Sequence, residues 1–99
     1  MTRLVEAVAK IRSKNAGPFW LTIDIFCGSS EAFARVSRDL TTETVAATFQ
    51  VEPQAIKRFD LDDLHVVKFS LPRPYVQGTV ADRDMHGASY ATLLRDIEI

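Results

Sequence analysis

The segment from Phe19 to Cys27, FWLTIDIFC, constrains the fold most strongly because its apolar side chains alternate. In a strand, the odd-numbered residues would share one face and the even-numbered residues, including Trp20 and Phe26, would share the other. Aromatic side chains on both faces predict a central strand that is partly covered on both sides. A chain with this segment is expected to build a sheet around it.

The residues before this strand show the spacing of a helix. Leu4, Val8 and Ile11 recur at helical intervals, and Thr2 can cap the first turn. The pattern predicts an amphipathic helix over residues 3–12 that ends before Gly17-Pro18.

The residues after the strand predict two more helices. Gly28-Ser29-Ser30 interrupts the strand and offers a helix cap, and Phe33, Val36 and Leu40 mark a helix over about residues 30–39. Thr41 or Thr42 then caps a short third helix, which Pro53 closes.

The second half of the chain predicts a hairpin and a long connection. Residues 55–61 form a weak strand, the acidic stretch 60–63 a turn, and residues 64–71 a strand rich in Val and Phe. Residues 72–90 show no period, and so long a connection in a small domain is usually functional. Residues 91–99 could be a strand or a short helix, and the spacing of Leu93, Ile97 and Ile99 favours a strand.

This order of elements is typical of an α+β fold. We expect a ferredoxin-like antiparallel sheet with helices packed on one face, in which the connection 72–90 replaces the second crossover helix. Residues 1–99 form a single domain, as the length of 99 residues indicates.

Composition excludes several classes of function. The formal net charge of −1 gives no global basic footprint, so nucleic acid is not an expected partner. No apolar run approaches the roughly 20 residues of a membrane span. The single cysteine, Cys27, cannot form an internal disulfide, and the N-terminus lacks the apolar centre of a signal peptide. We therefore expect a cytoplasmic protein.

Two polar clusters are candidate sites, and the first comprises Arg12, Ser13, Lys14 and Asn15. One interpretation is that the two cations complement the dipole of a helix C-terminus. The other is an anion site, because a guanidinium, an ammonium, a hydroxyl and free turn amides suit a carboxylate or phosphate.

The second cluster is DRDMHGASY, Asp82 to Tyr90. Asp84 and His86 are candidate acid/base groups, and Arg83 and Ser89 are candidate anion ligands. The alternative is a surface loop with an Asp–Arg pair. His65 is the other histidine and Cys27 stands alone, so no metal site and no cofactor are expected. Both are interpreted as core or core-edge residues.

The motifs IRSKNAGPFWLTIDIF and LPRP…DRDMHGAS…LL resemble the short AtuA-related family, the domain of unknown function numbered 4387. The resemblance covers nearly the whole chain and extends to the C-terminal ferredoxin-fold domain of acyclic terpene utilisation protein A. The first motif of that domain typically reads Arg-Ser-Gly-Asp-Lys-Gly. Arg12, Ser13 and Gly17 match it, whereas Lys14, Asn15 and Ala16 depart from it.

The resemblance implies a partner, because in the longer protein this domain is fused to a large N-terminal domain. A free-standing copy is expected to be the small subunit of a complex with a large AtuA-like protein. The implied chemistry is a lyase- or hydratase-type step on branched or terpenoid acids, with an acidic small molecule or acyl-CoA as ligand. The alternatives are a non-catalytic interaction module, a stand-alone binder of small molecules, and association into homo-oligomers.

Overall fold

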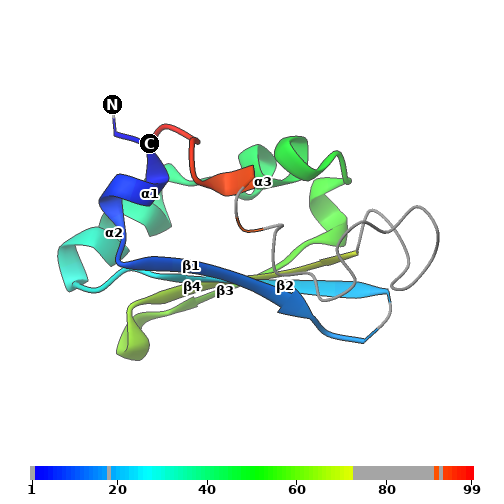
Figure 1. The fold of residues 1–99 in the computed structure, drawn as a ribbon, viewed down its shortest axis with the longest axis horizontal. Coiled ribbons are helices and arrows are strands. Elements are labelled where there is room, and N and C mark those ends of the chain that lie inside the picture. The colour runs from blue at the N-terminus through cyan, green and yellow to red at the C-terminus, as the bar shows by residue number, and fades with distance from the viewer. Residues whose placement is uncertain (1, 18, 73–90, 92) are drawn as a thin grey trace.

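The computed structural model describes residues 2–17, 19–72, 91 and 93–99, and its centre is a four-stranded sheet (Figure 1). Its strands, in chain order, are β1 (Lys10–Asn15), β2 (Trp20–Phe26), β3 (Lys57–Leu61) and β4 (Val66–Pro72). They lie in the order β1-β2-β4-β3, and each neighbouring pair is antiparallel. The alternating segment therefore forms a central strand, and β3 and β4 form the predicted hairpin.

The helices α1 (Leu4–Ala7), α2 (Ser30–Asp39) and α3 (Thr42–Phe49) all lie on one side of the sheet (Figure 1). Ser29 caps α2, since its Oγ accepts a hydrogen bond from the amide of Ala32 at 3.1 Å. Thr41 caps α3 by accepting from the amide of Thr44 at the same distance. The structure confirms α2, α3 and the cap residues expected for them.

The connections confirm the expected α+β, ferredoxin-like fold. β2 leads through α2 and α3 to β3, and β4 then inserts between β2 and β3. β2 and β3 consequently run parallel with β4 antiparallel between them, which is the split β-α-β unit of ferredoxin-like folds. Short 3₁₀ turns at Pro53–Ala55 and Asp62–Leu64 precede and follow β3.

The core fills the space between the sheet and the helices. Leu21, Ile23 and Ile25 of β2 are fully buried, and their partners across β4 are the buried Leu71, Phe69 and Val67. No described helix or strand packs on the opposite side, which we call the outer face (Figure 1). None of the described helices is long and apolar enough to cross a membrane.

Two predicted elements are wrong. The helix expected over residues 3–12 ends at Ala7, and residues from Lys10 onward pair with β2, because this pairing satisfies their backbone groups along a whole strand. The tail is not a regular strand. It contains a 3₁₀ turn and an isolated bridge between Glu98 and Arg3, and Leu94 is buried whereas Leu93 is 51% exposed.

Candidate anion-binding face of the sheet

The first polar cluster lies on β1, so its side chains alternate between the two faces of the sheet. Arg12 and Lys14 are exposed on the outer face, whereas Ser13 and Asn15 point to the helix side. The interpretation as a complement to a helix dipole is wrong, because α1 ends before β1 begins. The anion-site interpretation now applies to a different geometry, in which the two cations share an open surface.

The pairing of the four strands arranges the outer face in rows. From β1 to β3, these rows read Lys10–Phe26–Val66–Leu61, Arg12–Asp24–Lys68–Phe59 and Lys14–Thr22–Ser70–Lys57. The last row places two hydroxyl groups between two ammonium groups. The Thr22 hydroxyl is buried and donates to the carbonyl oxygen of Lys14 at 3.4 Å, so the groups of this row suited to a carboxylate or phosphate are the two ammonium groups and the Ser70 hydroxyl.

The outer face is strongly basic although the whole chain is not. Its four strands present five cations there, Lys10, Arg12, Lys14, Lys57 and Lys68, but a single carboxylate, Asp24. That carboxylate lies 3.8 Å from the Nζ atom of Lys68, so it offsets one charge. Since the chain has a formal net charge of −1, positive charge is concentrated on this face.

A small depression opens beside the cations. Its volume is about 180 Å³, and its lining residues are Arg12, Ser13, Lys14, Asp24 and Phe26. Pockets for whole drug-sized ligands are larger, about 300–1,000 Å³. The depression therefore has the size for one anionic group of a ligand that extends over the surrounding surface.

Ser13 has a structural role that connects the two polar clusters. Its Oγ accepts a hydrogen bond from the amide of Ala91 at 2.9 Å, in a buried position. Ala91 directly follows the segment 82–90 in the chain. The first cluster thus holds the residue that comes directly after the second cluster in the chain.

The remaining candidates of the second cluster, Arg83, Asp84, His86 and Ser89, lie outside the described residues. The expectation that they share a pocket with Arg12 stays a prediction.

His65 and Cys27 are parts of the fold, as expected. His65 adopts a left-handed backbone conformation (φ 53°) at the end of a 3₁₀ turn, and its ring lies 6.1 Å from that of Phe33. Burial, with a smaller contribution from the charge of Asp60, raises the pKa of the Cys27 thiol. Such a thiol is a poor nucleophile. The described residues contain no cluster of three metal-ligating side chains.

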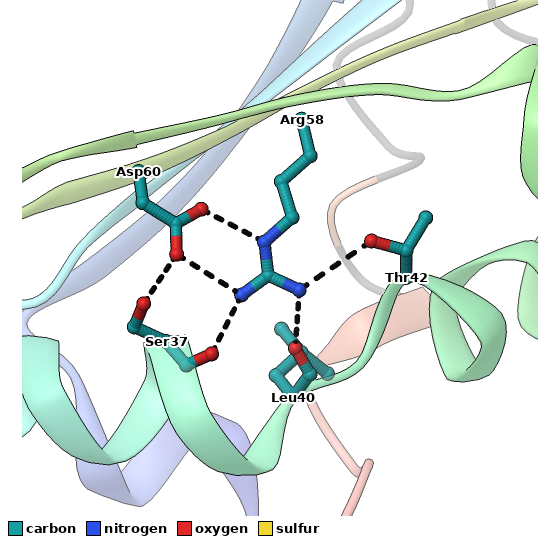
Figure 2. A network of polar contacts seen from close by, with 5 residues as sticks. All are labelled: Ser37, Leu40, Thr42, Arg58 and Asp60. Carbon is teal, nitrogen blue, oxygen red and sulfur yellow. Dashed lines mark hydrogen bonds and ion pairs between the residues drawn. The ribbon is translucent and has the colours of Figure 1, made fainter.

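Figure 2 shows a network on the helix side that the sequence analysis did not predict. The guanidinium of Arg58 donates to the carbonyl oxygens of Ser37 at 3.0 Å and Leu40 at 2.7 Å, both at the end of α2. It also donates to the Asp60 carboxylate at 2.8 Å and, at 3.5 Å, to Thr42 at the start of α3. One side chain of β3 thereby joins both long helices to the sheet.

The Asp60 carboxylate has two donors in this network. Ser37 donates its hydroxyl proton to Asp60, and Arg58 provides the ion pair. Burial alone would raise the pKa of Asp60, but these hydrogen bonds and the charge of Arg58 outweigh it and lower that pKa. The only sign of this network in the sequence was that Arg58 and Asp60 lie two residues apart and so share one face of a strand. An ordinary ion pair on the surface would have the same spacing.

Together, the fold and the outer face define a class of protein: a small α+β, ferredoxin-like domain with a basic sheet face on which none of the described helices or strands packs. The chain belongs to the family described as Domain of unknown function (DUF4387), whose sequence model matches residues 4–98. No curated protein and no solved structure matches the chain. The match confirms the family predicted from the two motifs, whereas the wider relation to acyclic terpene utilisation protein A stays a prediction.

Proposed function

We propose that this domain is a small subunit or accessory domain that contributes an anion-binding surface of the carboxylate or CoA type. The observation that carries the proposal is the concentration of cations on the outer face, with Arg12 and Lys14 beside a small depression. A guanidinium binds two oxygens of a carboxylate or phosphate at once, and a lysine adds a mobile point charge.

An acyl-CoA ligand fits this surface chemically because it combines phosphates with an aromatic base and an apolar acyl chain. The outer face combines cations with apolar and aromatic side chains, among them Trp20, Phe26 and Phe59. Phosphate groups would lie on the cations, and the flat or apolar parts would contact the aromatic rings.

The proposed partner is a separately encoded, large AtuA-like protein, and the proposed reaction is a lyase- or hydratase-type step on branched or terpenoid acids in the cytoplasm. Both follow from the resemblance of the two motifs to acyclic terpene utilisation protein A. In such a complex Asp84 and His86 would supply acid/base groups, while the outer face holds the acidic end of the substrate.

The test is a titration of the domain with coenzyme A, alone and together with the large protein. Replacing Arg12 and Lys14 by Glu should abolish measurable binding, and Arg12→Lys should weaken it about 10- to 100-fold, the value of a charge-assisted contact. Arg38→Glu is the matched control, since Arg38 is an exposed cation on α2.

Four outcomes decide between the candidate functions. Binding that needs both proteins supports the accessory subunit, and binding by the domain alone indicates a stand-alone binder. Binding that falls equally in Arg12→Glu and Arg38→Glu would refute a site at the outer face. Assembly with the large protein without any coenzyme A binding would indicate a pure interaction module.

A further inference from the structure

A second surface feature lies at the opposite edge of the sheet, on β3 and the turn after it. Phe59 is 47% exposed, Leu61 36% and Leu64 68%, and these account for half of the large apolar side chains exposed among the described residues. β3 is an edge strand, so the outward backbone row of the strand is not paired with any described strand. Exposed apolar edges are templates for pairing with another chain.

The sequence of β3, KRFDL, is complementary to itself in an antiparallel register centred on Phe59. In that register Phe59 lies opposite Phe59 of a second copy, and Lys57 lies opposite Leu61. On the helix side Arg58 lies opposite Asp60 of the second copy, so no like charges face each other, and both side chains are already paired within their own chain. Aromatic pairs and opposite-charge pairs are favourable cross-strand neighbours.

The other edge of the sheet does not offer this complementarity. Pairing β1 with a second β1 about Arg12 would place Arg12 opposite Arg12 and Lys10 opposite Lys14. Like charges directly opposite each other destabilise a strand pair, and edge lysines are a common protection against such pairing. The β3 edge is therefore suited to pairing with a second copy of itself, whereas the β1 edge is not.

We propose that β3 pairs antiparallel with β3 of a second copy of this chain, which joins two four-stranded sheets into one continuous sheet. Residues opposite each other in an antiparallel pair share a face, so the two basic outer faces would lie on the same side of the joined sheet. The proposal rests on β3 and does not need the anion site, because Arg12 and Lys14 lie on β1 at the far edge; Lys57 and Phe59 belong to both surfaces, so self-association is measured without any ligand.

The first experiment measures self-association by sedimentation velocity, from about 1 to 100 μM. Wild type should dimerise, and Phe59→Glu should weaken the dimer at least about tenfold, because two carboxylates would then face each other. Phe19→Glu is the control. Phe19 is 59% exposed but lies outside the strands, so that variant should still dimerise.

The second experiment tests the register by oxidative cross-linking. Phe59→Cys should form a covalent dimer by itself, because paired Cβ atoms lie about 5 Å apart across such strands. Leu61→Cys alone should not, since its two copies would lie about 13 Å apart along the strands. A mixture of Leu61→Cys and Lys57→Cys should cross-link, which only this register predicts.

The proposal is overturned by a wild-type chain that stays monomeric over the whole range, or by a dimer that Phe59→Glu does not weaken. Cross-linking of Leu61→Cys alone as efficient as that of Phe59→Cys would also overturn it. Association of β3 with a different protein only, seen as cross-linking of Phe59→Cys to that protein and never to itself, counts against it as well. Circular dichroism of each variant shows whether the fold is intact.

Discussion

Arg58 shows how a single residue can hold several elements of a small domain. Its guanidinium is largely buried, with the side chain 19% exposed, and its donors reach Ser37, Leu40, Thr42 and Asp60 (Figure 2). The guanidinium carbon also lies 5.3 Å from the centroid of the Phe69 ring. Two of the acceptors are carbonyl oxygens at the end of α2, where a helix has no internal donors left.

We predict that Arg58→Ala lowers the free energy of unfolding by about 2–3 kcal/mol, because it removes charge-assisted hydrogen bonds and leaves partly buried acceptors without a donor. Arg58→Lys should recover only part of this loss, since a lysine cannot reproduce the planar fork. Urea denaturation measures both. Arg38→Ala, which removes an exposed cation, should stay near wild type. Equal effects of Arg38→Ala and Arg58→Ala would contradict the prediction.

At the scale of elements, the start of β1 depends on a close approach between two segments of the chain. The amide of Ala9 donates to the carbonyl oxygen of Phe26 at 2.9 Å, which begins the pairing of β1 with β2. Gly28 lies beside this contact with φ +87°, and a Cβ atom there would meet the Cβ of Ala9 at 3.0 Å. Gly17 also has a positive φ, +85°, but its surroundings are open.

We therefore predict that Gly28→Ala destabilises the fold by about 2–4 kcal/mol and Gly17→Ala by only about 1–2 kcal/mol, which is the backbone strain alone. Thermal or urea unfolding compares the two glycines. Adding Ala9→Gly to Gly28→Ala should recover part of the loss because it removes the close contact, and a double-mutant cycle measures this coupling. A coupling energy of zero would show that the contact does not matter.

The same element shows where prediction from the sequence fails. Leu4, Val8 and Ile11 have helical spacing, whereas residues 12–15 are all polar, so the sequence shows no alternation that would reveal the strand. The strand depends on β2, which offers a partner for every residue of β1. A pairing across a turn is a tertiary event, and it outweighs local propensity here.

Other elements were predictable because one local signal decided each of them. The alternation from Phe19 to Cys27 identified the central strand, and Ser29 and Thr41 identified the starts of α2 and α3. The candidate site was predictable only as a set of residues. The sequence identified Arg12 and Lys14 as candidate residues. It did not show that their side chains lie on the opposite face of the sheet from that of Ser13, because this arrangement arises only when the segment forms a strand.

At the scale of the whole molecule, the free energy of unfolding at acidic pH depends on Asp60. This carboxylate belongs to the network that joins β3 to both long helices. Its pKa is lowered, so the folded state binds this proton more weakly than the unfolded chain, in which the pKa is about 3.9. The stabilising contribution of the carboxylate is therefore complete above about pH 4 and is lost as the pH falls through the folded-state pKa.

We predict that the difference in unfolding free energy between wild type and Asp60→Asn is largest near pH 7 and shrinks as the pH falls below about 4 and through the lowered folded-state pKa of Asp60, because both proteins then carry a neutral group at this position. Urea denaturation at a series of pH values measures it. Asp39→Asn is the control, because the pKa of Asp39 is also lowered, chiefly by its hydrogen bond with Arg38, but this pair is exposed and belongs to one helix. If the Asp60→Asn difference stayed constant with pH, the ionised carboxylate would not be what links the helices to the sheet, and the shape of Asp60 alone would account for its role.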